Sequence, residues 1–510
     1  MGLTPAPTTL WVFAWVALAP LIVLVHPGIC RSSLRFKVLL CLLWGIGYHG
    51  LALSWIRDLH PLTWMGIPWL GSVAITLFAW SFITLWGAAI PVLWCLSLHL
   101  FYRRIPPSPP PPPLPLLLLS VSVWCLLETI WGWGPLYWTA LAYTQSPHNL
   151  LILHLGQLSG PMAVTAALVA INQLWAEAWI AAKDTTSGRV RRLLALNGAL
   201  LIALHLVGFG LYSQPLRDVP ETALKVGIVQ GNVPTRIKLF EEGLQLSLQN
   251  YLQGYLRLAD AGVDAVLMPE GALPWHWVDT PHQEQNRLYQ AILQRGVMAW
   301  VGTVGTREGR ITQTIFTITG DGRAFSRYDK VKLVPLGEYI PFEAVLGAVI
   351  DRLSPVGSSM LPGRADQTLD TPFGRAIAGI CYESAFPELF RHQTQAGGQF
   401  ILTASNNDPY GRGMMAQHHA QDLMRAIEND RWAARATNTG LSGIVDPHGK
   451  TEWLSGFRTG EAHAHTIYRR TTQTLYVRWG NWLTPVLLAI ALGLWKTHQG
   501  QKTEDQQAKH

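Results

Sequence analysis

The chain has 510 residues, of which 49% are hydrophobic and only 14% are charged, and it contains 23 tryptophans. This composition is typical of a membrane protein, and the length allows about two or three domains. The net charge of +7 does not indicate a nucleic-acid partner, because the basic residues fall mostly in loops between apolar runs, where membrane topology explains them. The 5 cysteines show no paired spacing, which excludes a disulfide framework.

Apolar runs toward the N-terminus predict a transmembrane helical bundle of about six spans within residues 1–213. The expected spans are 10–25, 38–56, 64–101 (with an interfacial start at 64–69), 116–133, 162–179 and 193–212. The proline-rich stretch 105–115 predicts a stiff polyproline linker. A shorter apolar run at 483–495 predicts a C-terminal transmembrane helix over 480–496, and the polar segment 497–510 predicts a disordered cytoplasmic tail.

The charges of the loops set the orientation of these spans. Loops rich in Lys and Arg follow the first, third and fifth spans, whereas the intervening loops carry almost none. The basic residues are Arg31, Arg35, Lys37, Arg103, Arg104, Lys183, Arg189, Arg191 and Arg192. By the positive-inside rule the basic loops are cytoplasmic, so we expect the loop 134–160 and the segment after the sixth span to be extracytoplasmic.

From residue 223 the pattern changes to that of a soluble α/β domain, which we expect over residues 223–472. The expected strands are 224–230, 263–268, 298–304, 312–319, 376–380, 400–404 and 442–446. The expected helices are 239–259, 285–294 and 417–427. Strands that alternate with helices predict sheets covered by helices.

Three residue types with complementary chemistry stand at the ends of apolar runs in this domain. Glu270 and Cys381 each follow a predicted strand, and Lys330 stands just before a third apolar run. A lone cysteine is most often a small buried hydrophobe, but a nearby cation lowers the pKa of a thiol and stabilises an oxyanion. Cys381 is therefore the candidate nucleophile, Glu270 the candidate general base and Lys330 the candidate cation, with Lys332 competing for the lysine role.

In this order, the carboxylate, the lysine and the cysteine resemble the Glu–Lys–Cys triad of the nitrilase, or carbon–nitrogen hydrolase, superfamily. The resemblance implies an α-β-β-α sandwich, so the expected fold class is a multi-span α-helical membrane bundle plus an extracytoplasmic α/β nitrilase-like domain. The family spacing, counted back from Glu338, favours Lys330 over Lys332.

Three further residues match family positions that support the triad or bind substrate: Glu338, Tyr382 and Glu383. The backbone N–H of Tyr382 would be a second donor to an oxyanion. Glu338 and Glu383 fit equally well as a structural pair that holds Lys330 in place.

A nitrilase-like domain between the last two spans of a membrane bundle resembles, over nearly the whole chain, the apolipoprotein N-acyltransferases of bacteria. The matching pieces are 229–234, 269–274, 333–341, 381–383 and 437–440. The resemblance implies that Cys381 takes an acyl chain from a membrane phospholipid, typically phosphatidylethanolamine, as a thioester. The N-terminal α-amine of a diacylglyceryl-cysteine apolipoprotein then accepts the chain. It further implies an enzyme without cofactor or metal, in the bacterial inner membrane, with a periplasmic catalytic domain.

Some features depart from the family or allow two interpretations. Leu239 stands where a tryptophan is often found, and the loop 405–411 is less aromatic than usual, which leaves the lipid contacts of both open. We also count one span fewer than the family usually has. The apolar residues of 342–353 recur at helical spacing and fit either a core-facing helix or an amphipathic arm that dips into the membrane.

Two other functions compete with acyl transfer. A membrane-tethered amidase or nitrilase that hydrolyses a carbon–nitrogen bond is disfavoured, since one anchor would be enough for a soluble substrate. A transporter or scaffold is disfavoured by the scarcity of charges within the spans, and the exception, Glu128, is either functional or paired. A zinc site at His418, His419 and Asp422 is not expected, because adjacent histidines on a helix point to different faces.

Overall fold

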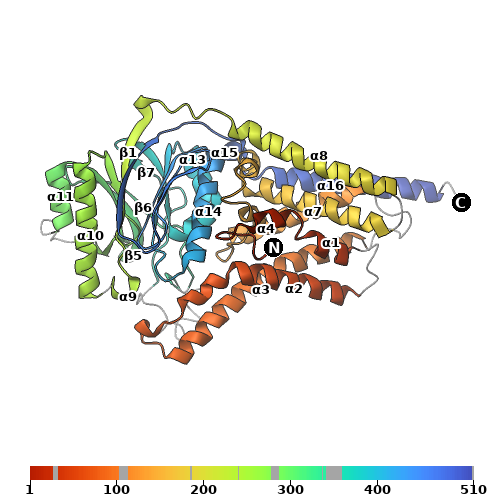
Figure 1. The fold of residues 1–510 in the computed structure, drawn as a ribbon, viewed down its shortest axis with the longest axis horizontal. Coiled ribbons are helices and arrows are strands. Elements are labelled where there is room, and N and C mark those ends of the chain that lie inside the picture. Colours follow the sequence, from red (N-terminus) through yellow and green to blue (C-terminus); the bar gives the residue numbers. More distant parts are fainter. Residues whose placement is uncertain are drawn as a thin grey trace. The chain divides into compact units, whose positions relative to one another are not determined.

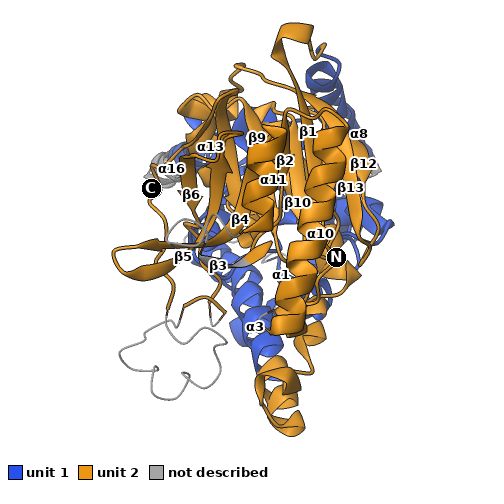
Figure 2. Cartoon of the chain, turned by 90° about the vertical axis from the view of Figure 1, so that its left-hand side faces the viewer, with its two compact units in different colours: residues 1–54, 77–214, 479–510 blue, residues 55–76, 215–478 orange. Residues whose placement is uncertain are grey.

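The computed structural model describes residues 1–26, 33–102, 113–183, 187–238, 240–276, 286–335, 337–339 and 359–507. The chain forms two compact units (Figure 2). The transmembrane unit comprises residues 1–54, 77–214 and 479–510, and the catalytic unit comprises 55–76 and 215–478. The segment 55–76 thus groups with the α/β domain, although the sequence placed it in the bundle.

The transmembrane unit is built from helices, shown in Figure 1. Five of the described helices are long and apolar enough to cross a membrane: α2 (Leu34–Ala52), α3 (Trp69–Tyr102), α4 (Pro113–Trp133), α7 (Pro161–Lys183) and α8 (Ser187–Tyr212). The shorter helices are η1 (Leu10–Trp15), α1 (Ala19–Val25), η4 (Leu141–Thr144), α5 (Leu150–Leu153) and α6 (Gly156–Ser159). The C-terminal helix is α16 (Leu483–Gln507).

Residues 10–25 form the expected apolar helical stretch, but it is interrupted and is shorter than a full span. A 3₁₀ turn, η1, ends at Trp15, and α1 begins anew at Ala19 with Pro20 in its first turn. Proline has no N–H to donate and suits the first turn of a helix. The N–H groups of Leu18 and Ala19 both donate to Oδ1 of the buried Asn172 at 2.9 Å, which stabilises the break.

The start of α4 and the end of α16 also differ from expectation. The helix α4 already begins at Pro113, so the polyproline linker does not extend to residue 115; prolines are tolerated in a first turn because those N–H groups have no helical partner. The helix α16 runs to Gln507, and disorder from residue 497 is therefore wrong. Its Lys, Gln and Glu residues are good helix formers that extend an already nucleated helix.

Glu128 is paired rather than free in the middle of the bundle. Its Oε1 accepts hydrogen bonds from Trp124 Nε1 at 3.1 Å and from the N–H of Leu141 at 2.9 Å. Its Oε2 accepts one from Thr165 Oγ1 at 2.8 Å. This carboxyl group therefore ties α4 to η4 and α7, which is the structural one of its two interpretations.

The catalytic unit contains two sheets. The seven-stranded sheet has the order β13-β1-β2-β4-β5-β6, with β3 paired to β4, and the six-stranded sheet has the order β12-β11-β10-β9-β8-β7. The strands of the first sheet are β1 (Ala223–Gln230), β2 (Ala265–Leu267), β3 (Leu273–His276), β4 (Met298–Arg307), β5 (Arg310–Ile318), β6 (Ala324–Asp329) and β13 (Glu461–Tyr468). Those of the second are β7 (Leu369–Thr371), β8 (Gly374–Ile380), β9 (Phe400–Ser405), β10 (Ala433–Thr437), β11 (Gly443–Val445) and β12 (Thr451–Leu454).

Helices cover the outer faces of both sheets, which confirms the α-β-β-α sandwich (Figure 1). Alternate residues of β8, such as Ala376 and Ala378, pack against Ile228 and other β1 residues in a core between the sheets. A second core joins the first sheet to α10 (Glu241–Asp260) and α11 (Arg287–Arg295). On the far side are α13 (Pro387–Gln395) and α14 (Arg412–Asn429), and Gly379 of β8 lies so close to Phe390 of α13 that an added Cβ would be 2.6 Å from its ring.

The remaining elements of this unit are short: η2 (Ser54–Leu59), η3 (Thr63–Met65), η5 (Pro220–Thr222), α9 (Thr235–Lys238), η7 (Cys381–Ala385) and α15 (Leu475–Trp479). The 3₁₀ turn η3 precedes the long helix α3, so the expected third span starts with a separate turn, and the interfacial location of this turn stays a prediction. Two predictions, the helical run 342–353 and the lipid contact at Leu239, lie outside the described residues.

Candidate active site

The cysteine proposed as nucleophile sits on a strained turn. Cys381 directly follows β8 and has φ +51°, in the left-handed region that residues with a Cβ rarely adopt. Such outliers concentrate at functional sites, where the surrounding structure holds them. The side chain is largely buried, and its thiol points to the carbonyl oxygen of Asn406 at 3.8 Å.

The other two members of the predicted triad form a buried ion pair. Lys330 Nζ donates to Glu270 Oε1 at 2.9 Å and to Glu338 Oε1 at 2.6 Å. The second oxygen of Glu270 accepts the N–H of Asn406 at 2.9 Å. The backbone of Asn406 therefore bonds Glu270 through its N–H and faces the Cys381 thiol through its carbonyl, which brings the three predicted residues together.

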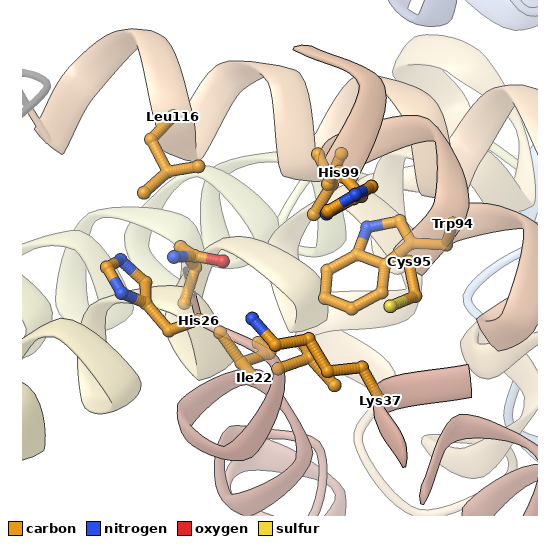
Figure 3. A pocket seen from close by; sticks show the side chains of 10 residues that line it. Ile22, His26, Lys37, Trp94, Cys95, His99 and Leu116 are labelled. Atoms are coloured by element: carbon orange, nitrogen blue, oxygen red, sulfur yellow. The ribbon is translucent and has the colours of Figure 1, made fainter. Parts of the chain in front are cut away.

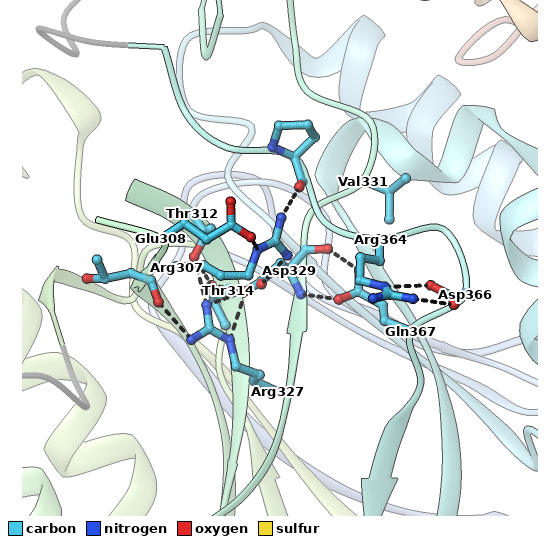
Figure 4. A network of polar contacts seen from close by, with 12 residues as sticks. Arg307, Glu308, Thr312, Thr314, Arg327, Asp329, Val331, Arg364, Asp366 and Gln367 are labelled. Atoms are coloured by element: carbon cyan, nitrogen blue, oxygen red, sulfur yellow. Dashed lines mark hydrogen bonds and ion pairs between the residues drawn. The ribbon is translucent and has the colours of Figure 1, made fainter. Parts of the chain in front are cut away.

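A polar network fixes the strand end from which Lys330 projects (Figure 4). Asp329 Oδ1 accepts hydrogen bonds from Arg327 at 2.6 Å and from Thr314 Oγ1 at 2.7 Å, and its Oδ2 accepts one from Arg307 at 3.1 Å. The Asp329 N–H donates to the side chain of Gln367 at 3.0 Å. Because Asp329 is held by its side chain and by its backbone, the backbone of the adjacent Lys330 has little freedom. The ammonium group of Lys330 is directed at Glu270 and Glu338.

Glu383 bonds to backbone rather than to the lysine side chain. Its Oε1 accepts the N–H groups of Val331 at 2.6 Å and Lys332 at 3.0 Å. Its Oε2 accepts the N–H of Ile380 at 2.7 Å and the hydroxyl of Tyr328 at 3.2 Å. This buried carboxyl group therefore ties the cysteine turn to the chain on both sides of Lys330. Glu338, in contrast, contacts the ammonium group directly and anchors itself on the Val334 N–H at 2.8 Å.

Burial and neighbouring charges set the protonation states of the site. Burial raises the pKa of Cys381 to about 12, with Glu270 acting in the same direction and Lys330 opposing it, so the resting side chain is a thiol. Burial alone lowers the pKa of Lys330, but Glu270 and Glu338 outweigh it and hold the pKa well above its usual value. The lysine is thus a permanent cation, and the thiolate forms only as a base takes the thiol proton.

A second polar network supports the cysteine turn from α14. His418 Nε2 donates to the Cys381 carbonyl at 2.8 Å, and its Nδ1 accepts from Asn407 Nδ2 at 3.1 Å. Burial, and then Arg435, lowers the pKa of His418 well below its usual value, which fits this neutral tautomer. Arg435 in turn bonds Asn407 at 3.2 Å and Asp422.

Three features of the site were missed by the sequence reasoning. The first is the supporting role of His418, which was considered only as a zinc ligand. The second is Lys238, whose buried Nζ has no hydrogen-bond partner among the described residues and whose pKa burial lowers to about 8, opposed by the charge of Glu270. The third is the segment 55–76, where Trp55 packs edge-on against Tyr410 at 5.1 Å and Asp58 accepts the Gly411 N–H at 3.0 Å. For Lys238, the available signal in the sequence was its position four residues after the matching piece 229–234.

Within the described residues, no group of three His, Cys, Asp or Glu side chains has the arrangement of a metal site. His418 faces the Cys381 carbonyl, whereas His419 bonds Thr451 Oγ1 at 3.0 Å, so the adjacent histidines diverge. Tyr382 packs edge-on against Phe386 with ring centres 5.2 Å apart, directly beside the nucleophile in the sequence.

Comparison with known proteins matches both parts of the chain. Residues 225–457 match the carbon-nitrogen hydrolase family, and residues 1–174 match the apolipoprotein N-acyltransferase N-terminal domain. An apolipoprotein N-acyltransferase of Nostoc sp. is 53% identical over 497 residues, which cover 97% of each chain. The chain belongs to the apolipoprotein N-acyltransferase family. Members from Synechocystis sp. (43% identical, covering 97% of this chain and 98% of the relative) and Thermosynechococcus vestitus (42%, covering 88% and 84%) agree.

Membership of this family confirms the resemblance inferred from the sequence, including the acyltransferase class. With five described helices able to cross a membrane, the chain is a multi-pass membrane protein. The amidase alternative is not favoured, because the N-terminal match extends the similarity well beyond the hydrolase-like domain.

Proposed function

We propose that this protein transfers an acyl chain from a membrane phospholipid to the N-terminal α-amine of a diacylglyceryl-cysteine apolipoprotein, through a thioester on Cys381. The observation that carries the proposal is the buried Glu270–Lys330 pair beside this cysteine, joined to it by the backbone of Asn406. Family membership supplies the reaction class, and this geometry supplies the residues.

In the first half-reaction the Cys381 sulfur attacks the ester carbonyl of the phospholipid. Because the resting group is a thiol, its proton has to leave as the bond forms, and Glu270 is placed to receive it. Lys330 stabilises the oxyanion of the tetrahedral intermediate, and the Tyr382 N–H would be a second donor. The alkoxide of the lysophospholipid then leaves with the proton from Glu270, and the acyl-enzyme remains.

In the second half-reaction the free amine of the apolipoprotein attacks the thioester carbonyl. Glu270 takes a proton from the attacking nitrogen, and the sulfur leaves and regains a proton as the thiol. The products are an amide and the free enzyme. The charge of Lys330 is available in both halves, because its raised pKa keeps it protonated.

We further propose phosphatidylethanolamine as the donor and the periplasmic side of the inner membrane as the location. The location is supported by the alternation of basic and nearly uncharged loops, which assigns the catalytic unit to the extracytoplasmic side. The donor follows from the family resemblance.

The test is a reconstitution of the purified protein with phosphatidylethanolamine and a diacylglyceryl lipopeptide. Wild-type protein should form the N-acyl lipopeptide and one lysophospholipid per amide, with little free fatty acid. Glu270→Gln should abolish this turnover, whereas Glu242→Gln, at an exposed glutamate in the first turn of α10, should leave it unchanged. Release of free fatty acid at the same rate with and without lipopeptide would instead identify a hydrolase.

A further inference from the structure

A cavity with mostly apolar walls and a few polar side chains lies within the transmembrane unit and plays no part in the proposed reaction (Figure 3). About 390 Å³ of space lie within the cavity and its open mouth together, and most of this space belongs to the mouth rather than to an enclosed chamber. Its lining residues are Ile22, Val25, His26, Lys37, Trp94, Cys95, Leu98, His99, Leu116 and Gln173. They come from α1, α2, α3, α4 and α7, or from positions directly after them, so several helices close around one space.

The cavity holds a mostly buried lysine, Lys37, that has no ion-pair partner among the described residues. Lys37 is only 6% exposed, and its ammonium group points into the space between the other lining side chains (Figure 3). Among the described residues it makes no ion pair and no hydrogen bond through its side chain. The stem of this side chain is buried while its ammonium group faces the open space, where an anion or water can bind it.

The same cavity also contains an acceptor without a donor. Gln173 is 1% exposed, and its Oε1 has no hydrogen-bond partner among the described residues. Its Nε2 donates to Glu177 Oε1 at 3.2 Å, and the same carboxylate oxygen lies 3.6 Å from His26 Nε2. Among the described residues, the carboxylate of Glu177 is therefore engaged by His26 and Gln173, and it forms no ion pair with Lys37.

These two groups define the chemistry of a ligand. It must carry an anionic oxygen for Lys37 and, close by, a hydroxyl or ammonium group that donates to Gln173. A phospholipid headgroup has both, as a phosphate and the alcohol or amine attached to it. The apolar walls, which include Ile22 and Leu98, and the exposed Phe36 and Leu39 on either side of Lys37 in the sequence suit the attached acyl chains.

The position along the helices agrees with headgroup depth. Lys37 lies in the first turn of α2, His99 in the last turn of α3 and Leu116 in the first turn of α4. These are the helix ends that the basic loops flank, which the positive-inside rule assigns to the cytoplasm.

We propose that this cavity binds the phosphate of a phospholipid headgroup from the cytoplasmic leaflet, with Lys37 as the anion-binding residue and Gln173 as the acceptor for a donor on the same headgroup. The site takes a lipid that is retained rather than consumed, because none of its lining residues belongs to the catalytic unit. The same phosphate chemistry is offered by free inorganic phosphate, so the test has to separate the two sources.

The experiment measures thermal unfolding of delipidated, detergent-solubilised full-length protein carrying Cys381→Ala, so that no lipid is turned over. Phosphatidylglycerol, phosphatidic acid, phosphatidylcholine or inorganic phosphate is titrated into it. Phosphatidylglycerol should raise the unfolding temperature in a saturable way. Lys37→Met should weaken its apparent affinity at least about 10-fold, and Arg35→Gln, at an exposed cation on the same helix, should not. Gln173→Leu should weaken the apparent affinity for phosphatidylglycerol more than that for phosphatidic acid.

Each further outcome decides a part of the proposal. A higher unfolding temperature of lipid-free Lys37→Met, together with loss of the lipid effect, supports it, since the variant removes an uncompensated buried charge. An equal rise in unfolding temperature with inorganic phosphate would identify the free anion, rather than a lipid, as the ligand. An unchanged lipid effect in Lys37→Met, or no effect of any anionic probe on the parent protein, would overturn the site. If Lys37→Met does not fold, native mass spectrometry of Gln173→Leu replaces it. Loss of the co-purifying lipid from Gln173→Leu supports the proposal, and a lipid content equal to that of the parent protein contradicts it.

Discussion

Glu338→Gln is the substitution that best isolates the electrostatics of the candidate site, because it keeps the shape of the side chain and removes one charge. Lys330 Nζ now bonds two carboxylates, at 2.9 Å to Glu270 and at 2.6 Å to Glu338. A hydrogen bond between charged groups contributes about 1.5–3 kcal/mol. If the whole of that is lost for the oxyanion-stabilising lysine, acyl-enzyme formation slows roughly 10- to 150-fold, since 1.4 kcal/mol is about tenfold.

The assay is a single turnover with phosphatidylethanolamine, followed as hydroxylamine-labile acyl groups on Cys381. The matched control is Glu452→Gln, which makes the same chemical change in an exposed pair with Lys450 at 2.8 Å. Surface pairs contribute only about 0–1 kcal/mol, so the control should behave as the wild type. A Glu338→Gln protein that acylates within about twofold of the wild type would refute the idea that this contact positions Lys330.

Three other predictions follow from the described contacts. His418→Leu removes the donor to the Cys381 carbonyl and should lower kcat about 10-fold with KM unchanged, and His418→Gln should recover part of the loss. Equal kcat values for the wild type and both variants would contradict a positioning role of His418. The pKa of Lys330 in the folded protein lies above the usual 10.5, so the stability that its charge contributes is complete below that value and is lost only as the pH rises through the raised pKa. Lys330→Met should therefore lower the unfolding temperature equally at about pH 7 and about pH 9, and a smaller effect at the higher pH would count against this reasoning. The membrane orientation can be tested with an impermeant maleimide on intact cells, in a protein without its native cysteines: His148→Cys, at an exposed residue of the loop 134–160, should be labelled and Gly188→Cys should not. The reverse pattern would contradict the predicted orientation, and Ser146 in the same loop is unsuitable because it is fully buried.

The strand ends that carry Glu270 and Cys381 could be predicted because each follows a run of small or branched apolar residues long enough to be a buried strand. Most expected strands were confirmed, with ends that shift by a few residues. β13 (Glu461–Tyr468) was missed, since its sequence is half polar and its side chains are only partly buried. It exists because it pairs antiparallel with β1 along its whole length, a tertiary contact that no local pattern contains.

The supporting residues of the site show the same limit. Cys381 and Glu270 were singled out by their chemistry, but their contact passes through the Asn406 backbone, and a peptide group carries no sequence signature. His418 lies 37 residues from Cys381 in the chain, and only the packing of α14 under the cysteine turn brings its ring to that carbonyl. The break at Pro20 was predictable in principle, because a proline marks a helix start, whereas the Asn172 side chain that satisfies it was not.

The most direct test of the account is the covalent state of Cys381. After incubation of the purified protein with phosphatidylethanolamine alone, peptide mass spectrometry should find one acyl group on Cys381, labile to hydroxylamine. It should disappear on addition of a diacylglyceryl lipopeptide with a free α-amine and persist with the N-acetylated lipopeptide, whose nitrogen is not nucleophilic. Cys381→Ala should carry no acyl group and make no product, whereas Cys125→Ala, at a buried cysteine of the other unit, should acylate normally. Conversion of lipopeptide by Cys381→Ala at the wild-type rate would contradict the covalent mechanism.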